Sequence, residues 1–344
     1  MGRGVWLKFF LAALAALAAA PAVAEVPLTV IAHRGASGER PEHTLAAYEL
    51  AIDYGADFIE PDLVSTRDGV LVARHENEIS GTTDVAAHPE FASRKATRTI
   101  DGHAVTGWFT EDFTLAELKT LRARERLPEL RPANTKYDGQ FEIPTFAEIL
   151  ALVKRKEAET DRRIGIEPEL KHPSYFASQG FALDDMVLQQ LAEAGYSKKD
   201  DPAIIQCFEV GTLAKLSTKT QLRLVQLLEA GTTPPDLPGV PTAAMVTPAG
   251  LKGIAAYADA LGADVRLVLN PDGSPTPLVA DAHAAGLEVQ VWTLRRENAF
   301  LPEALRIGSD PGAHGNYAAL VKLLEAAGVD AVFTDNPADA IAAR

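Results

Sequence analysis

The chain of 344 residues has very little cysteine, because Cys207 stands alone. A disulfide within one chain needs two cysteines, so the stability of the folded protein has to come from its core. Lipid attachment at a processed N-terminus needs a cysteine there, and the sequence has none in that region. Cys207 lies in the apolar stretch 203–208, where a small buried side chain is expected rather than a nucleophile.

Positive charge is scarce relative to negative charge. The sequence has 33 lysine and arginine residues against 47 aspartate and glutamate residues, a formal net charge of −14. Nucleic acid is therefore not expected as a partner, because it binds to basic surfaces. An acidic surface favours solubility and also suits a cation site. Hydrophobic residues make up 47% of the chain, which is enough for a large core and argues against disorder.

An apolar run occupies residues 9–20 near the N-terminus, after Arg3 and Lys8. The run is short for a hydrocarbon core of about 30 Å, and the sequence Ala22-Val23-Ala24 after it is typical of a cleavage site. We predict that residues 1–24 are a signal peptide and that residues 25–344 form one exported domain without stable membrane insertion. A membrane anchor is the alternative.

From residue 28 onward, short β-rich apolar runs alternate with segments of helical periodicity. This alternation predicts an α/β fold with a parallel sheet covered by helices, and eight repeats predict a closed TIM (β/α)₈ barrel. An open doubly wound sheet is the alternative, but the glycine-rich turn of a dinucleotide site does not follow the first strand. The predicted strands are residues 28–32, 58–65, 163–170, 203–208, 222–228, 264–269, 288–294 and 330–334.

The predicted helices cover residues 44–54, 146–156, 183–194, 212–216, 249–261, 277–285 and 317–327. Several of them end at a glycine, which favours the left-handed conformation of a helix stop: Gly55, Gly195, Gly262, Gly286 and Gly328. Residues 76–145 interrupt this regular spacing after the second strand unit. They predict a loop-rich insertion on the loop face of the barrel, where it would cap the substrate site, rather than a separate domain.

Polar residues follow or interrupt the first three predicted strands, and barrel enzymes carry their catalytic groups at the carboxyl ends of strands. Glu60 and Asp62 are two residues apart, so their side chains leave the same face of a strand about 7 Å apart. Buried together, they need a compensating charge, and a divalent cation with oxygen ligands supplies it. Glu169 is the third carboxylate, from the neighbouring strand. The alternative is that Glu60 and Asp62 are exposed on an edge strand.

Two histidines accompany this predicted metal site, His33 at the end of the first strand and His75 after the second. A phosphate ester needs one group to activate the attacking hydroxyl and another to protonate the leaving alkoxide, and histidine suits both. Arg34 and Lys171 would bind the phosphate oxygens. The alternative is that the histidines are structural. Of the other histidines, only His43 is a functional candidate.

These residues resemble the glycerophosphodiester phosphodiesterase family, especially its longer periplasmic members. The resemblance runs from residue 28 to 337. It rests on His33-Arg34-Gly35, Pro41-Glu42-His43-Thr44, Glu60-x-Asp62, His75, Glu169-x-Lys171 and Phe333-Thr334-Asp335-x-Pro337, with lesser matches at Gln206-Cys207-Phe208, Val225-Gln226-Leu227 and Trp292-Thr293.

The resemblance implies an enzyme that converts a small-molecule glycerophosphodiester and water into sn-glycerol 3-phosphate and an alcohol such as choline or ethanolamine, in the periplasm. It implies Ca²⁺, with Mg²⁺ or another divalent ion as alternatives, on Glu60, Asp62 and Glu169. His33 and His75 would be the acid/base pair. The implied substrate-binding residues are Arg34, Lys171, Glu42 and Trp292.

Two positions depart from the family pattern. His43 stands where asparagine is usual, although longer periplasmic members can carry histidine there. Glu167 adds a carboxylate on the strand of Glu169 and would compete as a metal ligand, but Glu169 has the family's spacing to Lys171. Two alternative functions remain at this point: a phospholipase-type phosphodiesterase that acts on intact lipids, and a non-catalytic periplasmic binding protein with the same fold.

Overall fold

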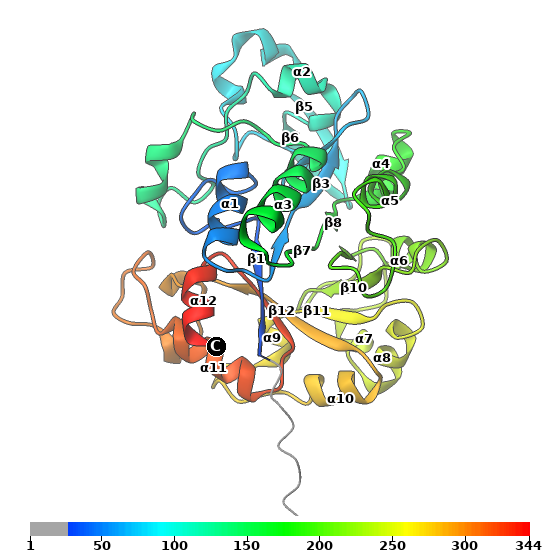
Figure 1. The fold of residues 1–344 in the computed structure, drawn as a ribbon, viewed down its shortest axis with the longest axis vertical. Coiled ribbons are helices and arrows are strands. Elements are labelled where there is room, and N and C mark those ends of the chain that lie inside the picture. The colour runs from blue at the N-terminus through cyan, green and yellow to red at the C-terminus, as the bar shows by residue number, and fades with distance from the viewer. Residues whose placement is uncertain (1–26) are drawn as a thin grey trace, which may run out of the picture.

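The computed structural model describes residues 27–344, so the predicted signal peptide lies outside the described residues. A ring of parallel strands forms the centre of the molecule (Figure 1). β1 (Thr29–His33) pairs with β13 (Ala331–Thr334) on one side and with β2 (Phe58–Glu60) on the other. β2 pairs with β7 (Gly165–Ile166), and β3 (Asp62–Ser65) continues its line and pairs with β8 (Glu169–Leu170).

The ring is completed by parallel pairing from β8 through four further strands to β13. With β2–β3 and β7–β8 each counted as one strand, the pairing closes an eight-stranded barrel within residues 27–344. The predicted TIM barrel is therefore confirmed. The four further strands are β9 (Ile204–Cys207), β10 (Arg223–Leu228), β11 (Ala260–Asp264) and β12 (Glu288–Leu294).

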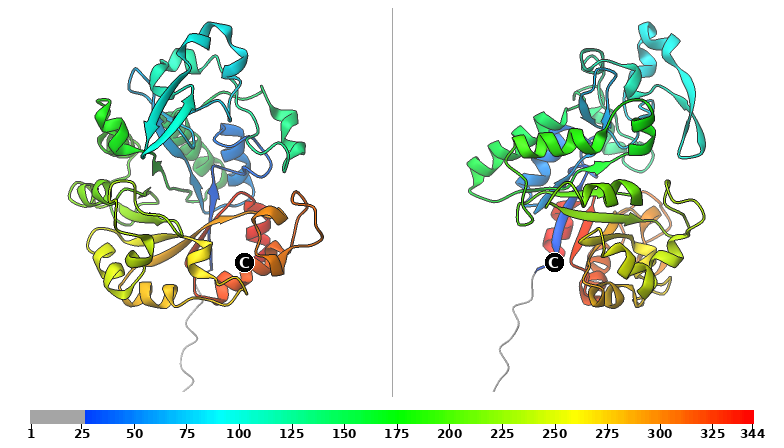
Figure 2. Two further views of the ribbon diagram at one scale, coloured as in Figure 1. Left: turned by 180° about the vertical axis from the view of Figure 1, so that it is seen from behind. Right: turned by 90° about the vertical axis from the view of Figure 1, so that its right-hand side faces the viewer.

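Helices surround the barrel and pack their apolar faces on the strands (Figures 1 and 2). No helix among residues 27–344 combines the length and the apolar character that a membrane span requires. The longer helices are α1 (Leu45–Asp53), α3 (Phe146–Thr160), α5 (Leu183–Glu193), α6 (Val210–Leu216), α8 (Pro248–Ile254), α10 (Leu278–Ala284), α11 (Tyr317–Ala326) and α12 (Pro337–Ala343), and the short ones around the barrel are α4 (Pro173–Ser178), α7 (Thr242–Met245) and α9 (Val265–Val268).

Two prolines interrupt strands that the sequence predicts as continuous. Pro61 separates β2 from β3, and Pro168 separates β7 from β8. Proline cannot donate a hydrogen bond to a sheet, so each break follows from the sequence. The carbonyls still pair, because Glu169 N donates to Pro61 O at 2.9 Å and Gln206 N donates to Pro168 O at 3.0 Å. The breaks therefore leave the carboxylate-bearing residues in register.

The sixth strand differs from its prediction at residues 264–269. The strand is Ala260–Asp264, and residues 265–268 form the short helix α9. Alanine and glycine dominate this strand, so its β propensity is low, whereas the Val/Leu-rich segment after it resembles a strand. Gly262 is consequently a strand residue and not a helix stop. A Cβ on it would lie 2.5 Å from Leu227 Cδ2, so the neighbouring strand's packing requires glycine.

Residues 76–145 fold against the barrel and share its core. Phe91, Phe113 and Leu118 belong to the same buried cluster as the barrel strands. Figure 1 shows this segment in cyan and green above the barrel. After β4 (Leu71–Ala73), which precedes it, its elements are the 3₁₀ turns Val85–Ala87, Pro89–Arg94, Thr110–Asp112 and Pro132–Tyr137, the hairpin β5 (Ala96–Ile100) and β6 (His103–Gly107), and α2 (Leu115–Leu118).

A glycine fixes the turn that carries the first cluster of polar residues. Gly35 has a φ of +84°, and a Cβ there would lie 2.5 Å from the backbone carbon of Ala47 in α1. The turn after β1 can therefore approach α1 this closely only because residue 35 has no side chain.

Gly35→Ala is expected to lower the free energy of unfolding by more than about 3 kcal/mol, because backbone strain and a backbone clash add together. Gly139→Ala is the matched control, since Gly139 has a φ of +79° but an open surrounding. It should cost only about 1–2 kcal/mol. Urea denaturation of both variants measures the difference, and equal losses would show that the clash is relieved by movement of α1.

Candidate active site

A cavity of about 1310 Å³ opens at the carboxyl ends of the barrel strands. Its wall contains seven of the nine residues that the sequence predicts for the site. Asp62 lies directly beneath this wall and Glu42 lies behind it. The seven lining residues are His33, Arg34, Glu60, His75, Glu169, Lys171 and Trp292.

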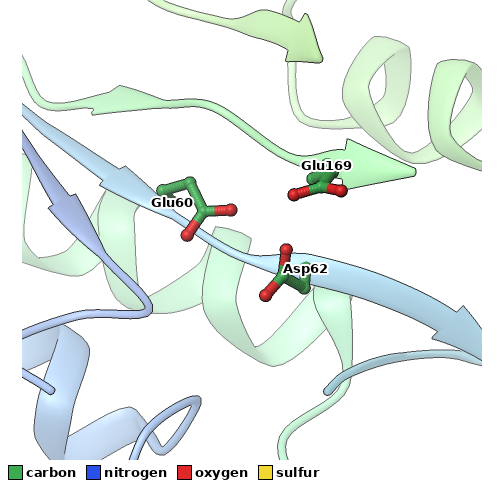
Figure 3. A group of neighbouring side chains, drawn as sticks. All are labelled: Glu60, Asp62 and Glu169. Carbon is green, nitrogen blue, oxygen red and sulfur yellow. The ribbon is translucent and has the colours of Figure 1, made fainter. Parts of the chain in front are cut away.

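Three carboxylates meet at the floor of the cavity. Glu60, Asp62 and Glu169 each offer an oxygen atom within 4.8 Å of the others, and all three side chains are buried. Figure 3 shows Glu60 and Asp62 on one strand facing Glu169 on its neighbour. Register explains the meeting, because Asp62 in β3 is paired with Glu169 in β8.

The electrostatics of this group indicate a missing positive charge. Burial and the neighbouring carboxylates raise the pKa of Glu60 well above its ordinary value, and burial raises the pKa of Glu169 to about 8 although Lys171 opposes the shift. Burial acts on Asp62 too, but Lys171 and Arg34 outweigh it and hold the pKa of Asp62 well below its ordinary value. A divalent cation would relieve this repulsion.

The oxygen atoms themselves fit such a cation. Among the described residues, Asp62 Oδ1 and Glu169 Oε1 are buried and accept no hydrogen bond of normal geometry. The Lys171 ammonium lies 3.4 Å from the first and 2.7 Å from the second. Buried carboxylate oxygens that converge on one place are ligands that hard divalent ions prefer.

Glu167 does not join the carboxylate group. It lies before the Pro168 break. The polar groups that act on its pKa are Arg223, at the start of β10, and Gln290, in β12. Its side chain is fully buried. Burial raises the pKa of Glu167 to about 8, which favours the neutral acid. The prediction that Glu169 rather than Glu167 faces the other carboxylates agrees with this placement.

His33 is held by a carboxylate at the end of the last strand. Its Nδ1 lies 2.6 Å from Asp335 Oδ1, so Asp335 accepts the Nδ1 proton and Nε2 is left for chemistry. Burial and Arg34 lower the pKa of His33 to about 3, although Asp335 opposes the shift. A neutral imidazole with a free Nε2 can accept a proton.

Asp335 is a site residue that the sequence analysis quoted in a motif without assigning it a role. It also accepts hydrogen bonds from Arg131 Nη2 at 2.6 Å and from Arg295 Nε at 2.7 Å. The position of Asp335 directly after β13 was the available signal, because such positions face the mouth of a barrel. Its two arginine partners are far away in the sequence, and no motif marks them.

His75 follows β4 and lines the same cavity as His33. Its ring is 30% exposed, and its Nδ1 lies 3.3 Å from Glu76 Oε1. Burial lowers the pKa of His75 well below its ordinary value, and Arg34 and Lys171 act in the same direction. The structure therefore brings both predicted histidines to the cavity that the carboxylates line.

Arg34 connects the carboxylate group to Glu42. Its Nε lies 3.1 Å from Asp62 Oδ2, and its Nη1 donates to Glu42 at 3.2 Å. Glu42 is buried and also accepts from Arg126 Nε at 2.7 Å. Glu42 thus orients Arg34 from behind, and Arg126, which lines the cavity, is a further site residue that the sequence analysis missed.

His43 supports the metal site from below. It is fully buried, its Nε2 lies 2.8 Å from Asp62 Oδ2, and its Nδ1 lies 2.6 Å from the Tyr48 hydroxyl. It does not line the cavity. His43, which stands where the family usually has asparagine, therefore hydrogen-bonds to Asp62 behind the cavity lining. It is not a third catalytic histidine.

An aromatic pair forms the wall opposite the histidines. Phe208 and Trp292 pack edge to face with their ring centroids 5.7 Å apart, and both line the cavity. The Trp292 indole is fixed by a hydrogen bond from Nε1 to Gly262 O at 2.9 Å. The cavity lining therefore combines charged side chains with an apolar aromatic surface, and the Lys171 ammonium lies 5.9 Å from the Phe208 ring centroid.

The turn of the β5–β6 hairpin lines the cavity, and Figure 2 shows this hairpin as the cyan pair of strands. Asp101 in its turn accepts from His172 Nδ1 at 2.6 Å, and Glu76 accepts from His172 Nε2 at 2.7 Å. Burial would lower the pKa of His172, but these two carboxylates outweigh it and raise the pKa to about 9. Asp101, Gly102 and His103 all line the cavity, as expected for an insertion on this face.

The family model for the glycerophosphoryl diester phosphodiesterase family matches residues 33–339. The chain belongs to this family. Curated members that are similar to it include the glycerophosphodiester phosphodiesterase GDPD6 of Arabidopsis thaliana, 37% identical over 89% of this chain and 82% of that protein. Another is the glycerophosphodiester phosphodiesterase of Haemophilus influenzae, 31% identical over 90% of this chain and 87% of that protein.

Solved structures of family members have the same fold. A putative glycerophosphoryl diester phosphodiesterase from Silicibacter pomeroyi matches with a TM-score of 0.65 at 22% identity, over 92% of each chain. A phosphodiesterase from Oleispira antarctica, in complex with the product sn-glycerol-3-phosphate, matches with a TM-score of 0.61 at 22% identity, over 92% of this chain and 96% of that one. This family member is accordingly a phosphodiesterase on a TIM barrel.

The hairpin contact should depend on pH. The pKa of His172 is raised from 6.5 to about 9 in the folded protein, so its stabilising effect is complete below about pH 6.5 and disappears as the pH rises through 9. We expect His172→Gln to lower the free energy of unfolding by roughly 1–3 kcal/mol at pH 6 and by little at pH 9.5. Denaturation of both proteins across this range measures it; a constant difference would contradict the assignment of the charge to His172.

Proposed function

We propose that the enzyme hydrolyses glycerophosphodiesters such as glycerophosphocholine and glycerophosphoethanolamine to sn-glycerol 3-phosphate and the free alcohol, with Ca²⁺ on the three carboxylates. One observation carries the proposal: two histidines line a cavity whose floor is a buried carboxylate group and whose lining includes Arg34 and Lys171. The product complex of the similar Oleispira antarctica enzyme supports the choice of glycerol 3-phosphate.

Glu60, Asp62 and Glu169 would hold the cation, and a bound divalent ion would stabilise negative charge on the phosphate oxygens. Carboxylate oxygens are ligands that suit Ca²⁺, and Mg²⁺ is the alternative to test against it. Arg34 and Lys171 lie within 3.4 Å of these carboxylates and line the cavity, so they would bind the phosphate oxygens.

The two histidines divide the proton transfers. His33 is assigned the base, because Asp335 holds its Nδ1 proton and leaves Nε2 to accept the proton of the attacking hydroxyl. His75 is assigned the acid that protonates the leaving alcohol, and the Glu76 carboxylate 3.3 Å from its Nδ1 favours the protonated ring once the phosphate is bound. The Phe208–Trp292 pair would contact the carbon atoms of the glycerol and exclude water.

We also propose that residues 1–24 direct the chain to the periplasm and that residues 25–344 are the single catalytic domain. The continuous core across residues 28–343 supports the single domain. Cell fractionation, with N-terminal sequencing of the mature protein, tests the cleavage after Ala24; an uncleaved cytoplasmic product would contradict it.

His33→Ala and His75→Ala are each expected to lower kcat by about 10²-fold or more, because each removes one proton-transfer group. His283→Ala is the control: this histidine is partly exposed, bonds Asp330 on the outside of the barrel and should leave kcat unchanged. Steady-state release of glycerol 3-phosphate measures all three. Normal turnover in His75→Ala would remove that residue from the acid role.

Glu60→Gln is expected to weaken Ca²⁺ binding by about tenfold or more, because it removes a charged ligand from the buried group. Glu167→Gln is the matched control, since Glu167 is an equally buried carboxyl that the structure places outside the group. Isothermal titration of both variants with Ca²⁺ measures the effect. If Glu167→Gln weakened binding as much as Glu60→Gln, the ligand set would be wrong.

The direct test is the release of glycerol 3-phosphate from glycerophosphocholine by the purified mature protein, with Ca²⁺, with Mg²⁺ and after chelation. Activity that is lost on chelation and restored by Ca²⁺ supports reaction and metal together. Hydrolysis of phospholipid vesicles, with none of the soluble diester, would replace the proposal by a phospholipase activity.

A further inference from the structure

The loop between α2 and the 3₁₀ turn Pro132–Tyr137 brings an arginine of the insertion against the segments that follow β1, β12 and β13. The Arg131 side chain is only 4% exposed. It has a different acceptor for each of its three nitrogen atoms: Nη2 donates to Asp335 Oδ2 at 2.6 Å, Nε to Glu297 Oε1 at 2.6 Å and Nη1 to Ser37 O at 3.1 Å. Arg131 thus connects the insertion to the loops after β1, β12 and β13.

The contact with Asp335 has a direct effect on His33. Burial raises the pKa of Asp335, but Arg295, Arg131 and His33 outweigh it and hold the pKa well below its ordinary value. A carboxylate that stays ionised keeps accepting the Nδ1 proton of His33, and this fixes both the tautomer and the orientation of the ring. Without one of its arginines, Asp335 would lose a donor and could rotate away from Nδ1.

We propose that Arg131 is a positioning residue for catalysis: by holding Asp335, the insertion sets the orientation of His33. The proposal rests on the proposed function, in which His33 is the base. It assigns to residues 76–145 a part in the chemistry in addition to covering the cavity. Arg126, five residues earlier, reaches Arg34 through Glu42 from the same loop, so the insertion contacts both residues of the His33-Arg34 pair through a carboxylate.

A purely architectural role is the competing explanation, because Arg131 also joins Ser37 and Glu297 and would stabilise the insertion by these contacts alone. The two explanations differ in one respect. If Arg131 acts through Asp335, its removal must have little effect once Asp335 can no longer hold His33. If it acts by stabilising the insertion, its removal must have the same effect with or without Asp335.

A double-mutant cycle separates the explanations. Glu297→Gln is the background, because it avoids leaving a buried carboxylate without its partner when Arg131 is replaced. In this background Arg131→Gln is expected to lower kcat by about tenfold or more, with KM and the Ca²⁺ dependence changed less than about twofold, because the metal ligands are untouched. With Asp335→Asn added, Arg131→Gln should lower kcat by less than about twofold further.

Two controls complete the design. Arg124→Ala removes an exposed arginine of the same loop, 54% exposed, and should leave kcat unchanged. Arg131→Lys in the otherwise unchanged protein keeps the charge but reaches fewer acceptors, so it should recover part of the lost kcat; it also supplies the comparison if Arg131→Gln does not fold. Circular dichroism at the assay temperature gives the folded fraction by which each kcat is divided.

Equal losses of kcat with and without Asp335, or an unchanged kcat per folded molecule in both Arg131 variants, would overturn the proposal. These results leave the proposed function standing, because the unsubstituted enzyme hydrolyses glycerophosphocholine in the same assay. Absence of activity in the unsubstituted enzyme would instead reject the proposed function, and this inference with it.

Discussion

The structure depends on three carboxylates buried against one another at the floor of the barrel mouth. Bringing Glu60, Asp62 and Glu169 within 4.8 Å of each other costs free energy through desolvation and repulsion. The surrounding residues reduce that cost in different ways: Lys171 and Arg34 supply charge, and His43 supplies a hydrogen bond to Asp62. The three carboxylates still converge on one another, and a divalent cation would relieve the repulsion that is left.

Around this centre, His33 and Arg34 are each held by a carboxylate. Asp335 holds His33, Glu42 holds Arg34, and arginines of residues 76–145 hold both of these carboxylates. Such alternation keeps buried charges paired, which is the condition under which they are tolerated in a protein interior. It also means that the insertion and the barrel form one unit, in agreement with their common hydrophobic core.

The lining of the cavity divides chemically into charged side chains and the aromatic pair Phe208 and Trp292, and the turn of the β5–β6 hairpin contributes to it. A phosphodiester with a short carbon chain on one side matches this division, because its charge would lie over the cations and its carbon atoms against the rings. The His172 side chain joins the hairpin to the barrel beside this lining, through Asp101 and Glu76.

The sequence alone determined the barrel and most of the site. Strand periodicity and helix-stop glycines predict the eight units. The carboxyl ends of parallel strands must meet at one mouth, so the sequence could bring together His33, Glu60, Asp62, Glu169 and Lys171.

The sequence-based prediction failed at β11, where alanine and glycine give no β signal and packing against Leu227 decides instead. Only the tertiary structure decided that Asp335, Arg131 and Arg126 belong to the site. Their contacts with His33, Asp335 and Glu42 span 302, 204 and 84 residues of chain. Local sequence patterns indicate the period of a strand and the end of a helix. They do not indicate which distant residue supplies the opposite charge of a buried ion pair.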